Sequence, residues 1–143
     1  MSEEAAAKQA VERHVAAFNA HDPDADVLAA DIEWLSPGTQ FRGREQAVEF
    51  LRGFWDAFPD ARVHPARLIA EGSVVAGEGT FTGTHTGTMR TPDGELPPTG
   101  RQIEFRWMTT YEVRGDEIVA EHLIFDQAEL MAQLGVTPAA ASS

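Results

Sequence analysis

The spacing of hydrophobic residues along this chain changes once, near residue 60. Before that point apolar residues recur every three or four positions, which is the spacing of an amphipathic helix. One such stripe covers residues 3–20 and includes His14, and a second, strongly aromatic stripe covers residues 44–58. After residue 60 apolar and polar residues alternate, as they do on a strand with one buried face. The pattern predicts helices in the first part of the chain and a sheet in the second.

Shorter helices are indicated by residues that start regular structure. Asp22 and the proline after it form an N-cap and first-turn pair, which predicts a short helix through Leu28. Another short helix is expected after Asp126. Helices followed by a meander imply an α+β domain, with a curved, mostly antiparallel sheet packed against about three N-terminal helices and a short C-terminal helix. With 143 residues and 43% hydrophobic content, residues 1–137 are expected to form one domain and residues 138–143 a disordered tail.

Alternation and turn residues define the expected sheet. Strands are predicted at residues 32–35, 62–70, 73–84, 101–113 and 117–125. Gly72 and Gly115 mark the turns between the later strands. Residues 85–100, which are rich in Pro and Gly, are predicted to form a long loop.

Register decides which side chains face the helices. In the strand over residues 101–113 the odd positions are far more apolar than the even ones, so the odd set is expected to face inward. The predicted partners across the next turn are Val113 with Ile118, Thr109 with His122, Trp107 with Ile124 and Phe105 with Asp126. On this register His122, Ile124 and Asp126 point inward.

Two glycines suggest a cavity between sheet and helices. If Phe81 pairs near Phe105, Gly77 and Gly79 lie across from Thr109 and Trp107. Their missing side chains would leave space there, so a pocket is the expected result.

Asp126 is the expected catalytic residue of this pocket. A single carboxylate can act first as base and then as acid, and desolvation disfavours the charged form of a buried carboxylate, which helps that dual role. Asp126 and Glu129 also have the spacing of a capping box at the start of a helix. The residues alone leave both roles open.

The other expected site residues are mainly aromatic. Aromatic side chains could stack on a ring-containing ligand, although most of them are core residues by default. His14 and His122 are each expected to be either a substrate contact or a structural imidazole. The predicted substrate-binding set is His122, His14, Phe18, Trp34, Phe54, Phe58, Phe81, Phe105, Trp107 and Ile124.

The amino-acid composition limits the kinds of ligand and partner that are expected. The chain has no cysteine, and its five histidines show no ligand-pair spacing, so neither a disulfide nor a metal site is expected. The net charge of −12 opposes binding to nucleic acid or to an anionic membrane. An acidic start and the lack of a long apolar segment argue against a signal peptide or a membrane span. A cytoplasmic location is expected.

Several short motifs, taken in order, resemble one family. They are FNAHD at 18–22, SPG at 36–38, GRE at 43–45, AFPD at 57–60, GTHTG at 83–87, PPTGR at 97–101, and Asp126 followed by QLG at 133–135. Together they are similar to the SnoaL-like polyketide cyclases over nearly the whole chain. The resemblance implies the nuclear-transport-factor-2-like cone, a homodimer, and an aldol-type ring closure that needs no metal or organic cofactor. It also implies that Asp126 matches the catalytic aspartate of the family.

The expected function is therefore a cofactor-independent cyclase, or a related proton-transfer enzyme, acting on a small hydrophobic or aromatic carbonyl substrate with Asp126 as general acid/base. Two alternatives stay open at this stage. One is another enzyme on the same fold, such as an isomerase, dehydratase or hydrolase, because fold does not fix chemistry. The other is a non-catalytic protein that binds a hydrophobic small molecule.

Overall fold

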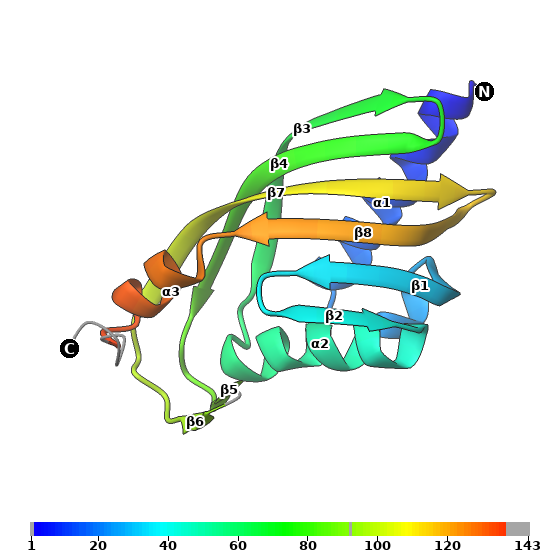
Figure 1. Ribbon diagram of the computed structural model, residues 1–143. Coiled ribbons are helices and arrows are strands. Elements are labelled where there is room, and N and C mark those ends of the chain that lie inside the picture. Colours follow the sequence, from blue (N-terminus) through cyan, green and yellow to red (C-terminus); the bar gives the residue numbers. More distant parts are fainter. Residues whose placement is uncertain (1, 92, 137–143) are drawn as a thin grey trace.

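The structure, a computed structural model, describes residues 2–91 and 93–136. The predicted disordered tail at residues 138–143 lies outside the described residues. The elements in chain order are α1 (Glu3–Asn19), a short 3₁₀ turn (Pro23–Ala25), β1 (Leu28–Ser36), β2 (Thr39–Arg42), α2 (Arg44–Ala57), β3 (Arg62–Glu71), β4 (Val74–Thr84), β5 (Met89–Thr91), β6 (Gly94–Leu96), β7 (Gln102–Arg114), β8 (Glu117–Phe125) and α3 (Gln127–Gln133) (Figure 1).

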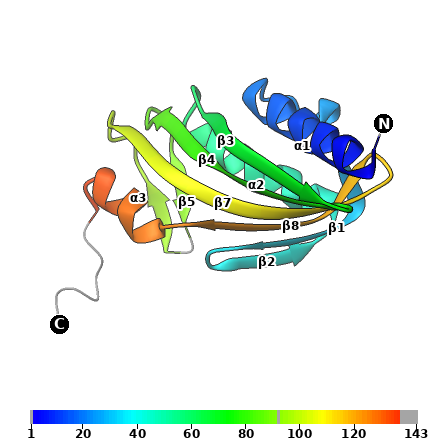
Figure 2. The ribbon, with the colours of Figure 1, turned by 90° about the horizontal axis from the view of Figure 1, so that it is seen from above.

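A curved six-stranded sheet forms the centre of the molecule. Its strand order is β2-β1-β8-β7-β4-β3, and all neighbours are antiparallel except β1 and β8, which run parallel. Helices α1 and α2 lie against the same concave face, while α3 lies at one end of the sheet (Figure 2). The α+β class is confirmed.

The placement of the helices differs from the prediction. Only α1 is N-terminal, because α2 lies between β2 and β3 and α3 follows the last strand. The short helix expected through Leu28 is wrong: the turn ends at Ala25, and Leu28 begins β1. Strand β2 was missed because its four residues are too few to show alternation, and the small sheet of β5 and β6 lies in the predicted loop.

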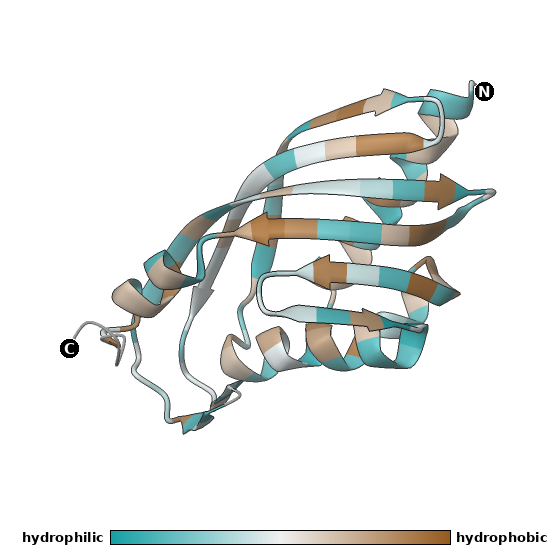
Figure 3. Cartoon of the chain, viewed as in Figure 1, coloured by the Kyte–Doolittle hydropathy of each residue, from teal (hydrophilic) through white to brown (hydrophobic). Residues whose placement is uncertain are grey.

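Both long helices are amphipathic as predicted. Helix α1 buries Ala7, Ala10, Val11, His14, Ala17 and Phe18. Helix α2 buries Leu51 and Trp55, and its ribbon carries alternating hydrophobic and hydrophilic bands (Figure 3). Burial of these apolar faces against the sheet, more than helix propensity, stabilises the two helices.

Strand β7 follows the prediction and β8 does not. All odd residues of β7 from Ile103 to Val113 are buried. Val113 pairs with Ile118 as expected, but β8 then contains one extra residue, Val119, so Glu112 pairs with Ala120. This β-bulge shifts every later pair by one position.

The bulge reverses the two faces of β8. Thr109 pairs with Leu123, and Trp107 pairs with Phe125, so the predicted partners His122 and Ile124 are wrong. Because side chains alternate along a strand, a shift of one residue moves each of them to the opposite face. His122 is exposed on the outer face, and Ile124 there is 69% exposed.

The glycines of β4 are placed as predicted but do not leave a void. Gly77 pairs with Thr109, Gly79 pairs with Trp107, and Phe81 pairs with Phe105. The indole of Trp107 lies over the two glycines and donates a hydrogen bond from Nε1 to the Thr80 carbonyl at 3.0 Å. The glycines therefore accommodate a large side chain.

We predict that Gly79→Ala destabilises the protein. A Cβ at this position would overlap the carbonyl oxygen of His64 and would lie 2.8 Å from the Trp107 ring. Urea unfolding should show a loss of about 1–3 kcal/mol in the free energy of unfolding, as for other overpacked sites. The control is Gly53→Ala at an exposed position of α2, where nothing lies within 4 Å of the new Cβ. This substitution should increase the free energy of unfolding by about 0.5–1 kcal/mol. An unchanged stability for Gly79→Ala would contradict the packing described.

Candidate functional site

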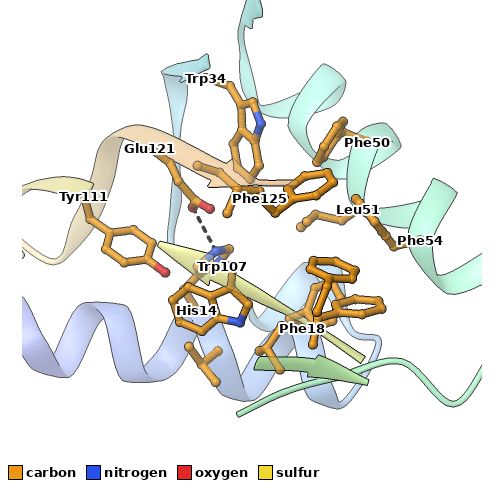
Figure 4. A pocket seen from close by; sticks show the side chains of 15 residues that line it. His14, Phe18, Trp34, Phe50, Leu51, Phe54, Trp107, Tyr111, Glu121 and Phe125 are labelled. Carbon is orange, nitrogen blue, oxygen red and sulfur yellow. Dashed lines mark ion pairs between the residues drawn. The ribbon is translucent and has the colours of Figure 1, made fainter. Parts of the chain in front are cut away.

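A small, largely aromatic cavity lies between the concave face of the sheet and helices α1 and α2 (Figure 4). Its volume is about 70 Å³. The lining side chains are His14, Val15, Phe18, Trp34, Phe50, Leu51, Phe54, Val63, Phe81, Phe105, Trp107, Tyr111, Glu121, Leu123 and Phe125. The lining residues that carry polar side-chain atoms are His14, Tyr111, Glu121 and the two tryptophans.

A buried cluster of charged groups includes His14 and Glu121 from the cavity lining and Asp26 next to them. His14 Nδ1 lies 2.8 and 2.9 Å from the two carboxylate oxygens of Asp26. On the other side of the ring, His14 Nε2 lies 3.0 Å from Glu121 Oε1. The exposed fractions of His14, Asp26 and Glu121 are 6%, 7% and 4%. The imidazole is thus held between two carboxylates inside the protein.

Each member of the cluster comes from a different part of the chain. His14 lies on the buried stripe of α1, four residues before Phe18. Asp26 ends the 3₁₀ turn that leads into β1, where its Oδ1 also accepts a hydrogen bond from Val27 N at 2.8 Å. Glu121 faces inward because of the bulge in β8.

The surroundings of His14 favour its protonated form. Burial alone would lower the pKa of His14, but the charges of Glu121 and Asp26, together with the hydrogen bonding of the ring N–H to Asp26, outweigh it. The pKa of His14 is therefore raised well above its usual 6.5. The shift favours the imidazolium form of the ring.

Glu121 Oε1 has no hydrogen-bond donor among residues 2–91 and 93–136. It forms an ion pair with His14, whose Nε2 lies 3.0 Å away. A buried acceptor without a donor is unfavourable and is rare in folded proteins. Because Glu121 lines the cavity, this oxygen is the candidate contact for a ligand there.

Tyr111 supplies a neutral hydroxyl to the cavity lining. Its ring meets His14 edge-on with centroids 6.0 Å apart, and its oxygen points toward His14 (Figure 4). Burial, and secondly the charge of Glu121, raise the pKa of Tyr111 well above 10.0, although a hydrogen bond with Thr109 acts in the opposite direction. The phenol stays protonated and can donate.

The indole N–H groups of the lining are already used by the protein. Trp34 Nε1 donates to Ser36 Oγ at 3.2 Å, and Trp107 Nε1 donates to the Thr80 carbonyl at 3.0 Å. The two tryptophans therefore present mainly ring carbon surface to the cavity.

Part of the predicted substrate-binding set lines the cavity, and binding by these residues stays a prediction. The members found there are His14, Phe18, Trp34, Phe54, Phe81, Phe105 and Trp107. Phe58 is fully buried in the core instead, with ring centroids 5.7 Å from Phe81 and 5.5 Å from His85. His122 and Ile124 lie on the outer face of the sheet because of the bulge.

Asp126 lies outside the cavity. It is exposed, and its Oδ1 accepts a hydrogen bond from Glu129 N at 3.1 Å, which makes it the N-cap of α3. The prediction that Asp126 points inward is wrong, because β8 ends at Phe125 with the opposite register. The capping interaction predicted from the D-x-x-E spacing is confirmed.

Sequence reasoning missed Asp26, Tyr111 and Glu121 as site residues. One signal was present for Glu121. Ile118 and Phe125 are both large and apolar but are seven residues apart, so a regular strand would put them on opposite faces. Both are buried, which requires an extra residue between them.

In the part of the chain that the structure describes, no three His, Asp or Glu side chains are placed to hold a metal ion. No helix there is long and apolar enough to cross a membrane.

Comparisons with solved structures support the fold. A candidate SnoaL-like polyketide cyclase from Jannaschia sp. CCS1 matches with a TM-score of 0.84 at 17% identity, over 96% of this chain and 97% of that chain. A candidate polyketide cyclase from Xanthomonas campestris pv. campestris matches with a TM-score of 0.82 at 24% identity, over 93% of this chain and 99% of that chain. IdmH from Streptomyces antibioticus, another candidate polyketide cyclase, matches with a TM-score of 0.76 at 27% identity, over 91% and 99%.

The family comparison covers most of the chain. A search of curated proteins gives no match. The family model of the SnoaL-like polyketide cyclases matches residues 8–134, which span every element from within α1 to α3. The resemblance in the sequence and the nuclear-transport-factor-2-like fold are both confirmed, and the chain belongs to the SnoaL-like polyketide cyclase family.

Proposed function

We propose that this protein is a cofactor-independent enzyme that transfers a proton at a carbon next to a carbonyl group, as in an aldol-type ring closure of a polyketide-like substrate. The supporting observation is that the polar wall of an otherwise apolar cavity contains a carboxylate oxygen, Glu121 Oε1, without a hydrogen-bond donor. In this proposal Glu121 takes the acid/base role that the sequence suggested for Asp126.

Glu121 acts as the base. Its Oε1 accepts the proton from the carbon next to a carbonyl, and the electron pair of that C–H bond moves into an enolate. The imidazolium of His14, 3.0 Å from Glu121 Oε1, stabilises the negative charge that develops on the enolate. Asp26 positions the ring through Nδ1.

Tyr111 and Glu121 complete the cycle. The Tyr111 hydroxyl donates a hydrogen bond to the enolate oxygen. The enolate carbon then attacks a second carbonyl carbon of the same chain, forming a C–C bond, and Glu121 returns its proton to the new alkoxide. No electron leaves or enters, so the reaction needs no redox partner. Holding the flexible chain in a ring-closing conformation contributes much of the acceleration.

The size of the cavity limits which part of a substrate it encloses. A dry cavity of about 150 Å³ is known to hold benzene, and this one has about half that volume. Phe50 and Phe54 from α2 are only half-buried, and their ring centroids lie 5.4 Å apart. We propose that the reacting carbonyl unit lies inside and that these two rings move aside for the rest of the molecule.

The alternatives make different demands on the same cavity. An isomerase or dehydratase would use the same base. An epoxide hydrolase of this fold is expected to need an arginine between two carboxylates, but Arg106 is exposed on the outer face. A non-catalytic protein that binds a neutral hydrophobic molecule would use the apolar lining alone and would not need Glu121.

We also propose that the protein is a cytoplasmic homodimer, as expected from the sequence. The outer face of the sheet carries exposed apolar side chains that support a subunit contact. Met108 pairs with Ile124 across β7 and β8, and Leu35 lies on the neighbouring β1.

We predict that Glu121→Gln abolishes proton transfer. Purified protein in heavy water should accelerate hydrogen–deuterium exchange at the α-carbons of acetone, which matches the cavity in size, and of β-tetralone, which requires Phe50 and Phe54 to move. Proton NMR measures both rates. The variant should lose a factor of about 100 or more, because a positioned acid/base contributes about that much.

Two further variants decide where the base lies. Glu112→Gln removes an equal charge from the outer face of β7 and should keep the wild-type rate. Asp126→Asn tests the expectation, based on the family resemblance, that Asp126 is the catalytic acid/base. Loss of exchange in Asp126→Asn with retention in Glu121→Gln would show that Glu121 is not the base, and binding of ketones without exchange by the wild type would favour the non-catalytic alternative.

The coupling between Glu121 and His14 gives a second prediction. Because the pKa of folded His14 is raised above 6.5, its contribution to stability is fully present below pH 6.5 and is lost as pH rises through the folded pKa. Glu121→Gln removes one cause of the shift, so the pKa of His14 should fall and the loss should begin at lower pH. NMR titration of the His14 ring protons, with urea unfolding across the same pH range, measures both. An unchanged pKa would show that the two groups do not interact.

A further inference from the structure

We propose that the same cavity binds small protonated alkylamines, held by the Glu121 carboxylate and the aromatic rings around it. This inference uses the cavity of the proposed function but does not depend on catalysis. It extends the ligand class from neutral carbonyl compounds to organic cations.

The charge of the buried cluster beside the cavity is not balanced. Two carboxylates, Asp26 and Glu121, face one imidazole, so the cluster is net negative whether or not His14 carries a proton. No lysine or arginine is among the described residues that line the cavity. Buried charge in apolar surroundings is costly unless it is paired. A cationic ligand would supply the missing charge.

The surroundings of Glu121 Oε1 favour a ligand that donates a hydrogen bond to this atom. Asp26 accepts hydrogen bonds from His14 Nδ1 and from the backbone N–H of Val27, so the protein itself supplies its donors. Glu121 Oε1 is 3.0 Å from His14 Nε2 but lacks a donor within the described residues. An ammonium N–H supplies both a donor and a positive charge to this atom, whereas a carbonyl oxygen supplies neither.

Aromatic rings stand on both sides of the carboxylate. Trp34 on β1 and Tyr111 on β7 are the direct cross-strand partners of Glu121, and all three side chains are buried on the concave face. Figure 4 shows these side chains converging with Trp107 and His14 on the cavity. Cations are attracted to aromatic faces within about 6 Å, most strongly to indole.

The volume sets the size of the cation. About 70 Å³ is roughly half of the ~150 Å³ that holds the six carbons of benzene. The enclosed part of the ligand is therefore about three or four non-hydrogen atoms, the size of isopropylammonium. Longer amines would extend between Phe50 and Phe54.

The test compares two ligands of equal size. Isopropylammonium chloride and isopropanol have the same shape and number of non-hydrogen atoms, and both donate hydrogen bonds, but only the first is charged. Isothermal titration calorimetry of the wild-type protein at neutral pH and constant ionic strength should show at least about tenfold tighter binding of the amine. Tetramethylammonium, which has charge but no N–H, should bind more weakly than isopropylammonium.

Two variants locate the binding site. Glu121→Gln should remove the preference for the amine over the alcohol, and Glu112→Gln, with the same charge change on the outer face, should keep it. Equal binding of the two ligands by the wild type, no binding of the amine, or a preference that survives Glu121→Gln would overturn the inference. The ligand comparison on the wild type holds even if Glu121→Gln fails to fold.

The outcomes also separate this inference from the proposed function. If the amine preference is present and ketone exchange is absent, the cavity is a cation site without the proposed catalysis. If exchange is present and the amine preference is absent, the catalysis stands and the cation inference fails.

Discussion

The extra residue Val119 in β8 is the feature on which the chemistry of the pocket depends. Because side chains alternate along a strand, this one insertion turns Glu121 to the concave face and His122 to the outer face. A regular strand would have placed Ala120 opposite Tyr111, where Glu121 now lies, and left Asp26 as the carboxylate partner of His14. With the bulge, His14 lies between two carboxylates, and one of them keeps an oxygen without a donor at the cavity.

The buried cluster is better explained by function than by stability. Burying ionisable groups is unfavourable unless every group is paired and hydrogen-bonded, and a well-packed apolar set of similar volume is often at least as stable. Asp26 meets that condition, whereas Glu121 does not. Buried groups that remain unsatisfied in a cavity are characteristic of sites that bind or react. The cluster also joins α1, the residues before β1 and β8, so its geometry depends on the docking of α1 against the sheet.

How much the sequence could predict follows from the length of each pattern. Helices α1 and α2 and the inner face of β7 were predicted correctly, because 13 to 17 residues of regular spacing leave little ambiguity. The four residues of β2 show no period, and the register of β8 was derived from its turn on the assumption of a regular ladder. The aromatic lining was partly found, because apolar spacing identifies buried faces. Asp26 and Glu121 were missed because their positions depend on contacts between distant segments and on a bulge.

Both proposals follow from the same unpaired oxygen, and they exclude each other at any moment. A base needs a lone pair that no protein donor occupies, and an ammonium ion needs the same lone pair. An amine bound at Glu121 would therefore block proton abstraction from a ketone and would also reduce the negative charge that makes the carboxylate basic. The space left by Trp107, whose ring covers Gly77 and Gly79, then decides how much of either ligand fits. In about 70 Å³ only the charged or reacting end is enclosed, and the rest must contact the half-buried rings of Phe50 and Phe54. Selectivity among larger ligands is thus a property of α2, while the chemistry is a property of β8 and α1.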